Sequence, residues 1–326
     1  MKPFVYILTF FFSAASFAQT TILNTSNQEP VSYATIAFGN GQGIFADDEG
    51  IFIFTKEMYS DVDTLLITAL GFKDQKIPTA NLPKTIYMEE ELSKLEEVIV
   101  EAPSNKKYKT EKIKNETHDD YFKCWLPTIE SEIAVYFPNE NDKVKKLAVV
   151  NFPIKTEASD WKKRNRSRAE KRPFSTLFRV QFYENNNGFP GDALSYQEIT
   201  FRVTEENEKV FDLDVNKYNI YMPDNGLFIS IQVLGYTDDN GKLLPNKKYK
   251  EIKGRDGEIV RIPTNFRPLL PFTDKLSGTR TFVKRIFIDN NQWNRFEKKS
   301  IYKSSLLDNG VNNYGMGIEM KIFKNE

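Results

Sequence analysis

The chain has 326 residues, of which 45 are Lys or Arg and 45 are Asp or Glu, so its formal net charge is zero. A neutral chain has no global field to draw it to nucleic acid or acidic lipid, and nucleic-acid binding is not expected. The length suffices for two domains of ordinary size, each with its own core.

Residues 1–18 have the features of a secretory signal peptide. Lys2 supplies a positive start, residues 4–12 an apolar run and residues 16–18 a small-residue cleavage site. The alternative is an N-terminal membrane anchor, but the apolar run is about half of the roughly twenty residues that span a bilayer. We expect an exported protein that starts at Gln19, has no transmembrane segment after cleavage and resides in the periplasm, at the outer membrane or outside the cell.

Cys124 is the only cysteine, so no disulfide can form within the chain. A lipid anchor is not expected, because no cysteine follows the predicted cleavage site. We expect Cys124 to be a packed side chain rather than a reactive thiol.

Short runs of alternating apolar and polar residues predict a small β-sandwich over residues 19–102. The predicted strands are residues 20–24, 31–38, 43–46, 51–55, 63–69, 72–77, 85–88 and 98–100. Gly50 can adopt the positive φ of a tight turn, so the segment from Asp47 to Gly50 is predicted to join residues 43–46 and 51–55 as a hairpin.

A family resemblance rests on the order of several short motifs. They are Pro30-Val31-x-x-Ala34-Thr35-Ile36, Gly43, Asp47-Asp48-Glu49-Gly50-x-Phe52, Asp63-x-Leu65-x-Ile67, Gly71-Phe72 and Leu95-Glu96-Glu97-Val98-Ile99-Val100. This part resembles the carboxypeptidase-regulatory-like domain, a transthyretin-like sandwich often found at the N-terminus of Gram-negative envelope proteins. The resemblance implies an accessory domain without catalytic residues. The family's TonB-dependent receptors continue into a plug and a barrel, for which the roughly two hundred remaining residues are too few.

Residues 103–120 are almost wholly polar and charged, without an apolar period, and predict an exposed linker. A short amphipathic helix is the alternative for this stretch.

Residues 121–326 predict a second, larger sandwich of jelly-roll type, so the expected fold class is all-β. The predicted strands are residues 131–137, 145–154, 177–184, 199–203, 209–214, 227–234, 258–262, 280–288, 294–299 and 315–323. The run from Phe178 to Tyr183 with the following Gly188 to Gly191, and later residues 212–213 and 218–220, resemble a C-terminal sandwich that accompanies the first domain in other envelope proteins. That resemblance implies no chemistry.

The residue types exclude several kinds of active site. A zinc carboxypeptidase needs two histidines and a carboxylate on the metal, but His118 is the only histidine. A nucleophilic pair of His118 with Cys124, six residues away, is not expected. No cofactor or metal site is predicted, whereas paired carboxylates for glycoside hydrolysis remain open.

Two acidic turns contain oxygen ligands of the kind that calcium prefers. They are Asp47-Asp48-Glu49 and Asp238-Asp239-Asn240. Neither has the spacing of a dedicated calcium loop, and local hydrogen bonding within a turn is the expected role.

Residues 161–172 form a basic loop, and this is the predicted ligand-binding segment. Its candidate residues are Trp161, Lys162, Lys163, Arg164, Arg166, Arg168, Lys171 and Arg172. Such side chains suit phosphate or carboxylate groups on acidic glycans, lipopolysaccharide or proteins. The alternative is a solvated loop. Trp161 and Trp293 could stack on sugar rings, with burial in the core as the alternative.

The sequence therefore favours a non-catalytic exported envelope protein that binds or scaffolds, with an anionic polysaccharide or an outer-membrane protein as its partner. The alternative is a glycan-active hydrolase with paired carboxylates. A third hypothesis is a subunit that docks onto an outer-membrane transporter through an exposed sheet edge.

Overall fold

The computed structural model describes residues 19–91, 107–140, 143–156, 173–207, 209–254, 256–288, 292–301 and 303–323. The predicted signal peptide, the predicted strand 98–100 and the whole basic loop lie outside these residues. The described part consists almost entirely of β-sheets, so the predicted all-β class is confirmed. Within it, no helix has the length and apolar character needed to cross a membrane.

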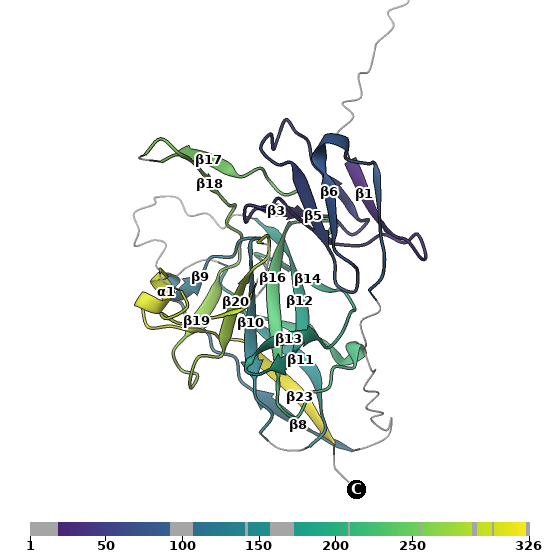
Figure 1. The fold of residues 1–326 in the computed structure, drawn as a ribbon. Coiled ribbons are helices and arrows are strands. Elements are labelled where there is room, and N and C mark those ends of the chain that lie inside the picture. Colours follow the sequence, from purple (N-terminus) through teal and green to yellow (C-terminus); the bar gives the residue numbers. More distant parts are fainter. Residues whose placement is uncertain are drawn as a thin grey trace, which may run out of the picture.

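The first sandwich packs a three-stranded sheet on a four-stranded sheet (Figure 1). The three-stranded sheet has the order β4-β1-β7, with β1 (Gln19–Asn24), β4 (Ile51–Ile53) and β7 (Thr85–Met88). The other has the order β3-β2-β5-β6, with β2 (Thr35–Ala37), β3 (Gly43–Phe45), β5 (Thr64–Thr68) and β6 (Gln75–Pro78), followed by the 3-10 turn η1 (Thr79–Asn81).

Alternation along β1 and β5 buries one face of each sheet. Ile22 of β1 and Leu65 and Ile67 of β5 have no exposed surface, and they pack with Phe52 of β4 in one apolar cluster. Burying side chains at every second position is what the period of two in the sequence predicts.

The predicted hairpin across Asp47 to Gly50 is wrong. β3 pairs with β2, whereas β4 pairs with β1 in the other sheet. The turn itself forms as expected, because Gly50 has φ +70° and Asp47 Oδ1 accepts hydrogen bonds from the N–H groups of Glu49 and Ile51 at 3.0 and 2.8 Å. This turn therefore carries the chain from one sheet of the sandwich to the other.

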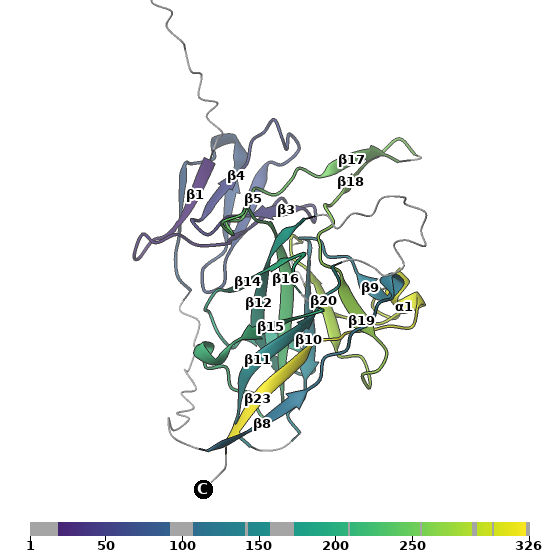
Figure 2. The same ribbon diagram turned by 180° about the vertical axis from the view of Figure 1, so that it is seen from behind.

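The second sandwich packs a seven-stranded sheet on a four-stranded sheet (Figures 1 and 2). The larger sheet contains β10 (Ser131–Phe137), β12 (Ser175–Asn186), β13 (Phe189–Ala193), β14 (Ile199–Thr204), β16 (Leu227–Tyr236), β20 (Thr281–Arg285) and β21 (Asn294–Arg295). The smaller sheet has the order β15-β11-β23-β8, with β8 (Tyr108–Ile113), β11 (Lys145–Pro153), β15 (Val210–Asp214) and β23 (Gly317–Phe323).

Smaller elements complete the described chain. They are η2 (Tyr121–Lys123), η4 (Asn216–Tyr218), α1 (Ser305–Asp308), the sheet of β9 (Cys124–Trp125), β19 (Leu270–Thr273) and β22 (Asn313–Tyr314), and the two-stranded sheet of β17 (Lys250–Lys253) and β18 (Ile259–Ile262).

The central strand β16 is buried along nine consecutive residues, from Leu227 to Gly235. Its apolar positions face the four-stranded sheet, where Ile229 and Ile231 share a cluster with Val150 of β11 and Ile318 of β23. Ser230 and Gln232 alternate with these apolar residues and are buried as well, so β16 is covered on both faces.

The prediction of an exposed linker over residues 103–120 is wrong for Tyr108–Ile113, which is strand β8. It pairs antiparallel with β23 along its whole length, from Ile113 opposite Ile318 to Tyr108 opposite Phe323. An edge strand whose faces are exposed to solvent needs no apolar side chains. The polar sequence of β8 therefore gave no strand pattern.

The two sandwiches interlock through β3. Phe45 of β3 belongs to the core of the second sandwich and lies 5.4 Å from the ring of Phe287. In return, Tyr249 of the second half is buried in the core of the first sandwich, and its hydroxyl accepts from the Gly43 N–H at 3.1 Å. Asn246 Oδ1 accepts from the Phe45 N–H at 2.9 Å. Shared apolar cores and buried hydrogen bonds hold the sandwiches in one arrangement.

Candidate functional site

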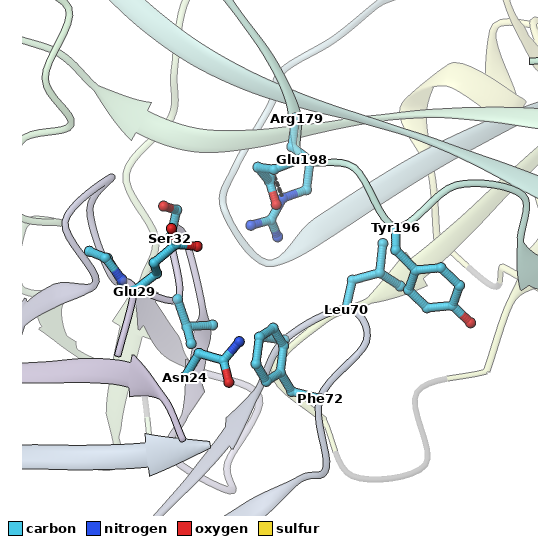
Figure 3. A pocket seen from close by; sticks show the side chains of 11 residues that line it. Asn24, Glu29, Ser32, Leu70, Phe72, Arg179, Tyr196 and Glu198 are labelled. Atoms are coloured by element: carbon cyan, nitrogen blue, oxygen red, sulfur yellow. Dashed lines mark hydrogen bonds and ion pairs between the residues drawn. The ribbon is translucent and has the colours of Figure 1, made fainter. Parts of the chain in front are cut away.

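A cleft of about 220 Å³ lies where the two sandwiches meet, and we call it the junction cleft. The first sandwich contributes Glu29, from the segment before β2, and Phe72, from the segment after β5. The second contributes Arg179 of β12 together with Tyr196 and Glu198 from the β13–β14 connection. Figure 3 shows Glu29 on one side and the paired side chains of Arg179 and Glu198 on the other.

Arg179 fixes the geometry of this cleft. Its Nε donates to Glu198 Oε1 at 2.8 Å, and its Nη2 donates to the main-chain carbonyl of Tyr33 at 2.6 Å. The guanidinium also lies 5.8 Å from the ring centroid of Phe45. Because its side chain is only 9% exposed, these partners replace most of its hydration. One arginine thus ties a loop of the first sandwich to a strand of the second.

We expect Arg179→Met to lower the free energy of unfolding by about 2–3 kcal/mol, because hydrogen bonds to a charged group are lost and the Tyr33 carbonyl loses a partner. Urea denaturation measures the change. Arg202→Met is the matched control, since Arg202 on β14 is exposed and, among the described residues, donates only to the Asp239 carbonyl; its expected effect is below about 0.5 kcal/mol. Equal losses in both variants would contradict the proposed anchoring role of Arg179.

The polar groups of the junction cleft offer mainly hydrogen-bond acceptors. Asn24 and Ser32 are already engaged, since Asn24 Nδ2 donates to Glu90 Oε1 at 2.6 Å and Ser32 Oγ donates to the Asp48 carbonyl at 2.6 Å. Glu29 Oε2 accepts from Asn27, and Glu198 Oε1 accepts from Arg179. Among the described residues, one oxygen of each carboxylate therefore remains open to a ligand.

Apolar surface completes the cleft, from Val31, Leu70, Phe72 and the ring of Tyr196. Gly71 has φ +82°, and a Cβ at this position would lie 3.1 Å from the Tyr196 ring. The glycine therefore permits both the turn and the close approach of the tyrosine. Two carboxylates against one arginine leave the cleft acidic, so it suits donors such as sugar hydroxyls or an ammonium group better than an anion.

A buried row of polar side chains continues from Arg179 across the seven-stranded sheet. In register, Arg179 lies opposite Gln232, Gln232 opposite Glu132, and Glu132 opposite Lys284. We call these four residues the polar row. Glu132 Oε2 lies 2.8 Å from Lys284 Nζ, and Glu132 Oε1 accepts from the Tyr183 hydroxyl at 2.7 Å.

Electrostatics within the polar row hold Glu132 ionised. Burial raises the pKa of this carboxyl, but the Lys284 ammonium and the hydrogen bonds from Lys284 and Tyr183 outweigh burial and lower the pKa below its usual value. The same environment raises the pKa of Tyr183 well above its usual value, through burial and the negative charge of Glu132. Lys284 also lies 4.6 Å from the ring centroid of Trp293. The row is a buried network in which Glu132 is paired, whereas Gln232 Nε2 has no hydrogen-bond partner among the described residues.

The sequence-predicted ligand residues, from Trp161 to Arg172, all lie outside the described residues. Trp293 is half-buried, with Lys284 Nζ 4.6 Å from its ring centroid. Lys242 contacts both acidic turns. Its Nζ lies 3.6 Å from Asp47 Oδ2 and also pairs with Glu49, and its main-chain N–H donates to Asp238 Oδ1 at 2.9 Å. Within the part of the chain that the structure describes, no group of three or more potential metal ligands occurs.

His118 is bound to the main chain through both ring nitrogens. Its Nε2 lies 2.7 Å from the Phe272 carbonyl, and its Nδ1 accepts from the Asp120 N–H at 3.2 Å. The thiol of Cys124 donates to the Asp120 carbonyl at 3.2 Å. The imidazole therefore ties the segment before β9 to β19 and is not oriented toward the cysteine.

Sequence reasoning did not single out Glu29, Tyr196 or Glu198. They lie in connections between strands, without a motif, and meet only through folding. A weak signal was present in Arg179, because a charged residue in the middle of the apolar run 177–184 needs a partner when it is covered.

Comparisons with known proteins assign no family to the chain. No family model matches it, and no curated protein matches it. One similar solved structure contains the cysteine protease and lectin-like domains of Cwp84, a surface layer associated protein of Clostridium difficile, with 12% identity, a TM-score of 0.31, and coverage of 59% of this chain and 32% of that one. Another is the clostridial cysteine protease Cwp84 after propeptide cleavage, with 11% identity, a TM-score of 0.33, and coverage of 65% and 40%. The chain thus spans less than half the length of either, and no functional conclusion is drawn from this similarity.

Proposed function

We propose that the chain is a non-catalytic binding module of the cell envelope and that its junction cleft binds a neutral saccharide unit. The observation that carries the proposal is the composition of the cleft, where open carboxylate oxygens of Glu29 and Glu198 lie beside the apolar surfaces of Phe72 and Tyr196. Sugars present hydroxyl donors on their rim and C–H groups on their faces, and both find complementary groups here.

Two features of the sequence support export to the envelope. Residues 1–18 have the pattern of a signal peptide, and residues 20–102 resemble the carboxypeptidase-regulatory-like domain. With no matching family model, that membership is part of the proposal.

Saturation-transfer NMR of residues 19–326 with glucose, galactose and glucuronate tests the cleft. We expect the neutral sugars to bind more tightly than glucuronate, because two carboxylates repel a third. Tyr196→Ala should weaken binding of the neutral sugars about tenfold, and Glu29→Gln should weaken it less. Tyr87→Ala is the matched control, because Tyr87 is 49% exposed on β7 and does not line the cleft. Unchanged binding by Tyr196→Ala, or no binding of any sugar, would refute the assignment.

A second candidate function is glycoside hydrolysis. It is favoured by the placement of two carboxylates, Glu29 and Glu198, on opposite walls of one cleft, as a general acid and a base or nucleophile require. Release of reducing ends from envelope glycan discriminates the two functions. Turnover that is abolished by Glu198→Gln would establish the hydrolase, whereas binding without turnover would support the module.

The basic loop remains the proposed contact for an anionic polysaccharide or an acidic outer-membrane protein. Clustered arginines form paired hydrogen bonds with phosphate and carboxylate groups, and salt screens such contacts. Changing its Lys and Arg residues to Ser should abolish salt-sensitive binding to lipopolysaccharide while sugar binding in the junction cleft persists. Unchanged lipopolysaccharide binding would remove the loop from the proposal.

A further inference from the structure

Strands β17 and β18 form a two-stranded sheet of their own, which we call the hairpin arm. Both views show it projecting to one side of the two sandwiches (Figures 1 and 2). Its large aliphatic side chains are exposed, with Ile252 at 41%, Ile259 at 67%, Val260 at 47% and Ile262 at 37%. An isolated hairpin is marginally stable in water, so this concentration of exposed apolar residues needs a reason.

One face of the hairpin arm is anchored to the first sandwich. Arg261 of β18 donates through Nη1 and Nη2 to both carboxylate oxygens of Asp61, at 2.7 and 2.8 Å, and through Nε to Glu251 Oε1 at 3.2 Å. The hydrogen bond from Arg261 lowers the pKa of Asp61, so the pair is ionised at neutral pH. This bidentate contact sets the direction of the arm. The opposite face carries the cross-strand pair of Ile252 and Val260, with Ile262 beside them.

The outer edge of β18 has free backbone groups. Gly254 N–H donates to the Glu258 carbonyl at 2.7 Å, so these two residues form a hydrogen-bonded pair. Hydrogen-bonded and non-hydrogen-bonded pairs alternate along an antiparallel ladder. By that alternation, Ile252 bonds to Val260 within the hairpin, and the N–H and C=O groups of Ile259 and Arg261 point outward. No strand in the described part of the chain pairs with this edge.

The two edges of the hairpin arm differ. β17 carries Lys250 and Lys253, and lysines on an edge strand discourage pairing. β18 has the sequence Ile-Val-Arg-Ile, without Lys, Pro or a bulge, and Pro263 follows only after the strand has ended. Only the β18 edge therefore lacks protection against strand addition.

We propose that the β18 edge accepts an extended segment of a partner protein in which apolar and acidic residues alternate. Backbone pairing would supply affinity, and the Ile252 and Val260 face would extend onto the apolar side chains of the added strand. On the arm, Glu251 is paired with Arg261. The exposed lysines 250 and 253 of β17, with lysines 247 and 248 directly before it, outnumber the remaining acidic residues Asp256 and Glu258, which favours acidic residues in the partner.

The same charges argue against two other occupants. A second copy of this chain would bring like-charged lysine clusters together. A bilayer would have to accept the charged turn with Asp256 and Glu258 at the tip of the arm. An acidic extended segment avoids both the repulsion between lysines and the transfer of the charged turn into a bilayer.

The test uses residues 19–326 and a ten-residue peptide of alternating Val and Glu, with alternate residues N-methylated so that only one edge can pair. Ile259→Pro removes an outward N–H and leaves the internal ladder intact, so the peptide's affinity should fall at least tenfold. Lys253→Pro is the matched control, because it removes an outward N–H on the opposite edge. Calorimetric affinities for both variants, with circular dichroism to confirm folding, measure the difference.

Undiminished binding by Ile259→Pro, or an equal loss in Lys253→Pro, would overturn the proposal. If Ile259→Pro misfolds, Val260→Lys replaces it, since a lysine on the apolar face should weaken binding without altering the backbone. A peptide of alternating Val and Lys should bind at least tenfold more weakly, and equal affinity would refute the acidic preference. Self-association that Ile259→Pro abolishes would assign the edge to a second copy instead.

Discussion

Replacing Lys284 by methionine is expected to lower the free energy of unfolding by about 3–5 kcal/mol at pH 7, because the variant leaves a buried carboxylate without its countercharge. Glu132 is 3% exposed at its side chain and keeps the neutral Tyr183 hydroxyl as a hydrogen-bond donor. Chemical denaturation measures the loss. Lys298→Met is the matched control, since Lys298 pairs with Asp308 at 3.6 Å with both side chains at least 70% exposed; its effect should stay below about 1 kcal/mol.

The same variant has a diagnostic pH dependence. In the native chain the pKa of Glu132 lies below its usual 4.5, so its contribution to stability is present above that value and is lost as the pH falls through the folded-state pKa. Without Lys284, burial dominates and raises the pKa of Glu132, so protonation now favours the folded state. The difference between native and variant should therefore shrink between pH 7 and pH 4. A difference that stays constant over this range would exclude Glu132 as its source.

Gly43→Ala is expected to destabilise the chain by about 3 kcal/mol, at the upper end for overpacking. A Cβ at this position would overlap Cδ1 of Phe287 and the main-chain carbonyl of Ile36. The ring belongs to the second sandwich and the carbonyl to the neighbouring strand β2, so relief requires moving one sandwich against the other. Thermal and urea unfolding measure the loss.

Gly278→Ala separates crowding from backbone strain. Gly278 has φ +69° and nothing within 4 Å of an added Cβ, so only the left-handed conformation contributes, at about 1 kcal/mol. Adding Phe287→Ala to Gly43→Ala should cost less than the sum of the two single changes, because the ring that collides has been removed. Additive losses would show that the crowding lies elsewhere.

The strands of both sandwiches could largely be predicted from sequence, because one face of each is buried and the period of two is strong. β1, β5 and β7 lie within one residue of their predicted bounds at each end. Pairing could not be predicted in the same way. The turn from Asp47 to Gly50 has hairpin chemistry, yet its flanking strands belong to different sheets, since a turn fixes chain direction and the core decides which strands become neighbours.

The burial of the polar row could not be predicted for a related reason. Along β10, β12 and β16, polar residues such as Glu132, Gln181 and Ser230 alternate with apolar ones, which predicts a solvated outer face. The structure covers this face, leaving Glu132 2% and Ser230 0% exposed. The covering segments are distant in sequence, and no local pattern specifies where they will lie.

The position of β23 has a consequence for how the chain comes to be folded. Strand β23 (Gly317–Phe323) lies between β11 and β8, in the interior of the four-stranded sheet. In sequence it comes after all the other described strands. Until β23 has been synthesised, β8 and β11 therefore have no strand between them to pair with. During synthesis one side of the apolar core of the second sandwich stays open, and we expect folding of this half to be completed only after Phe323 has emerged.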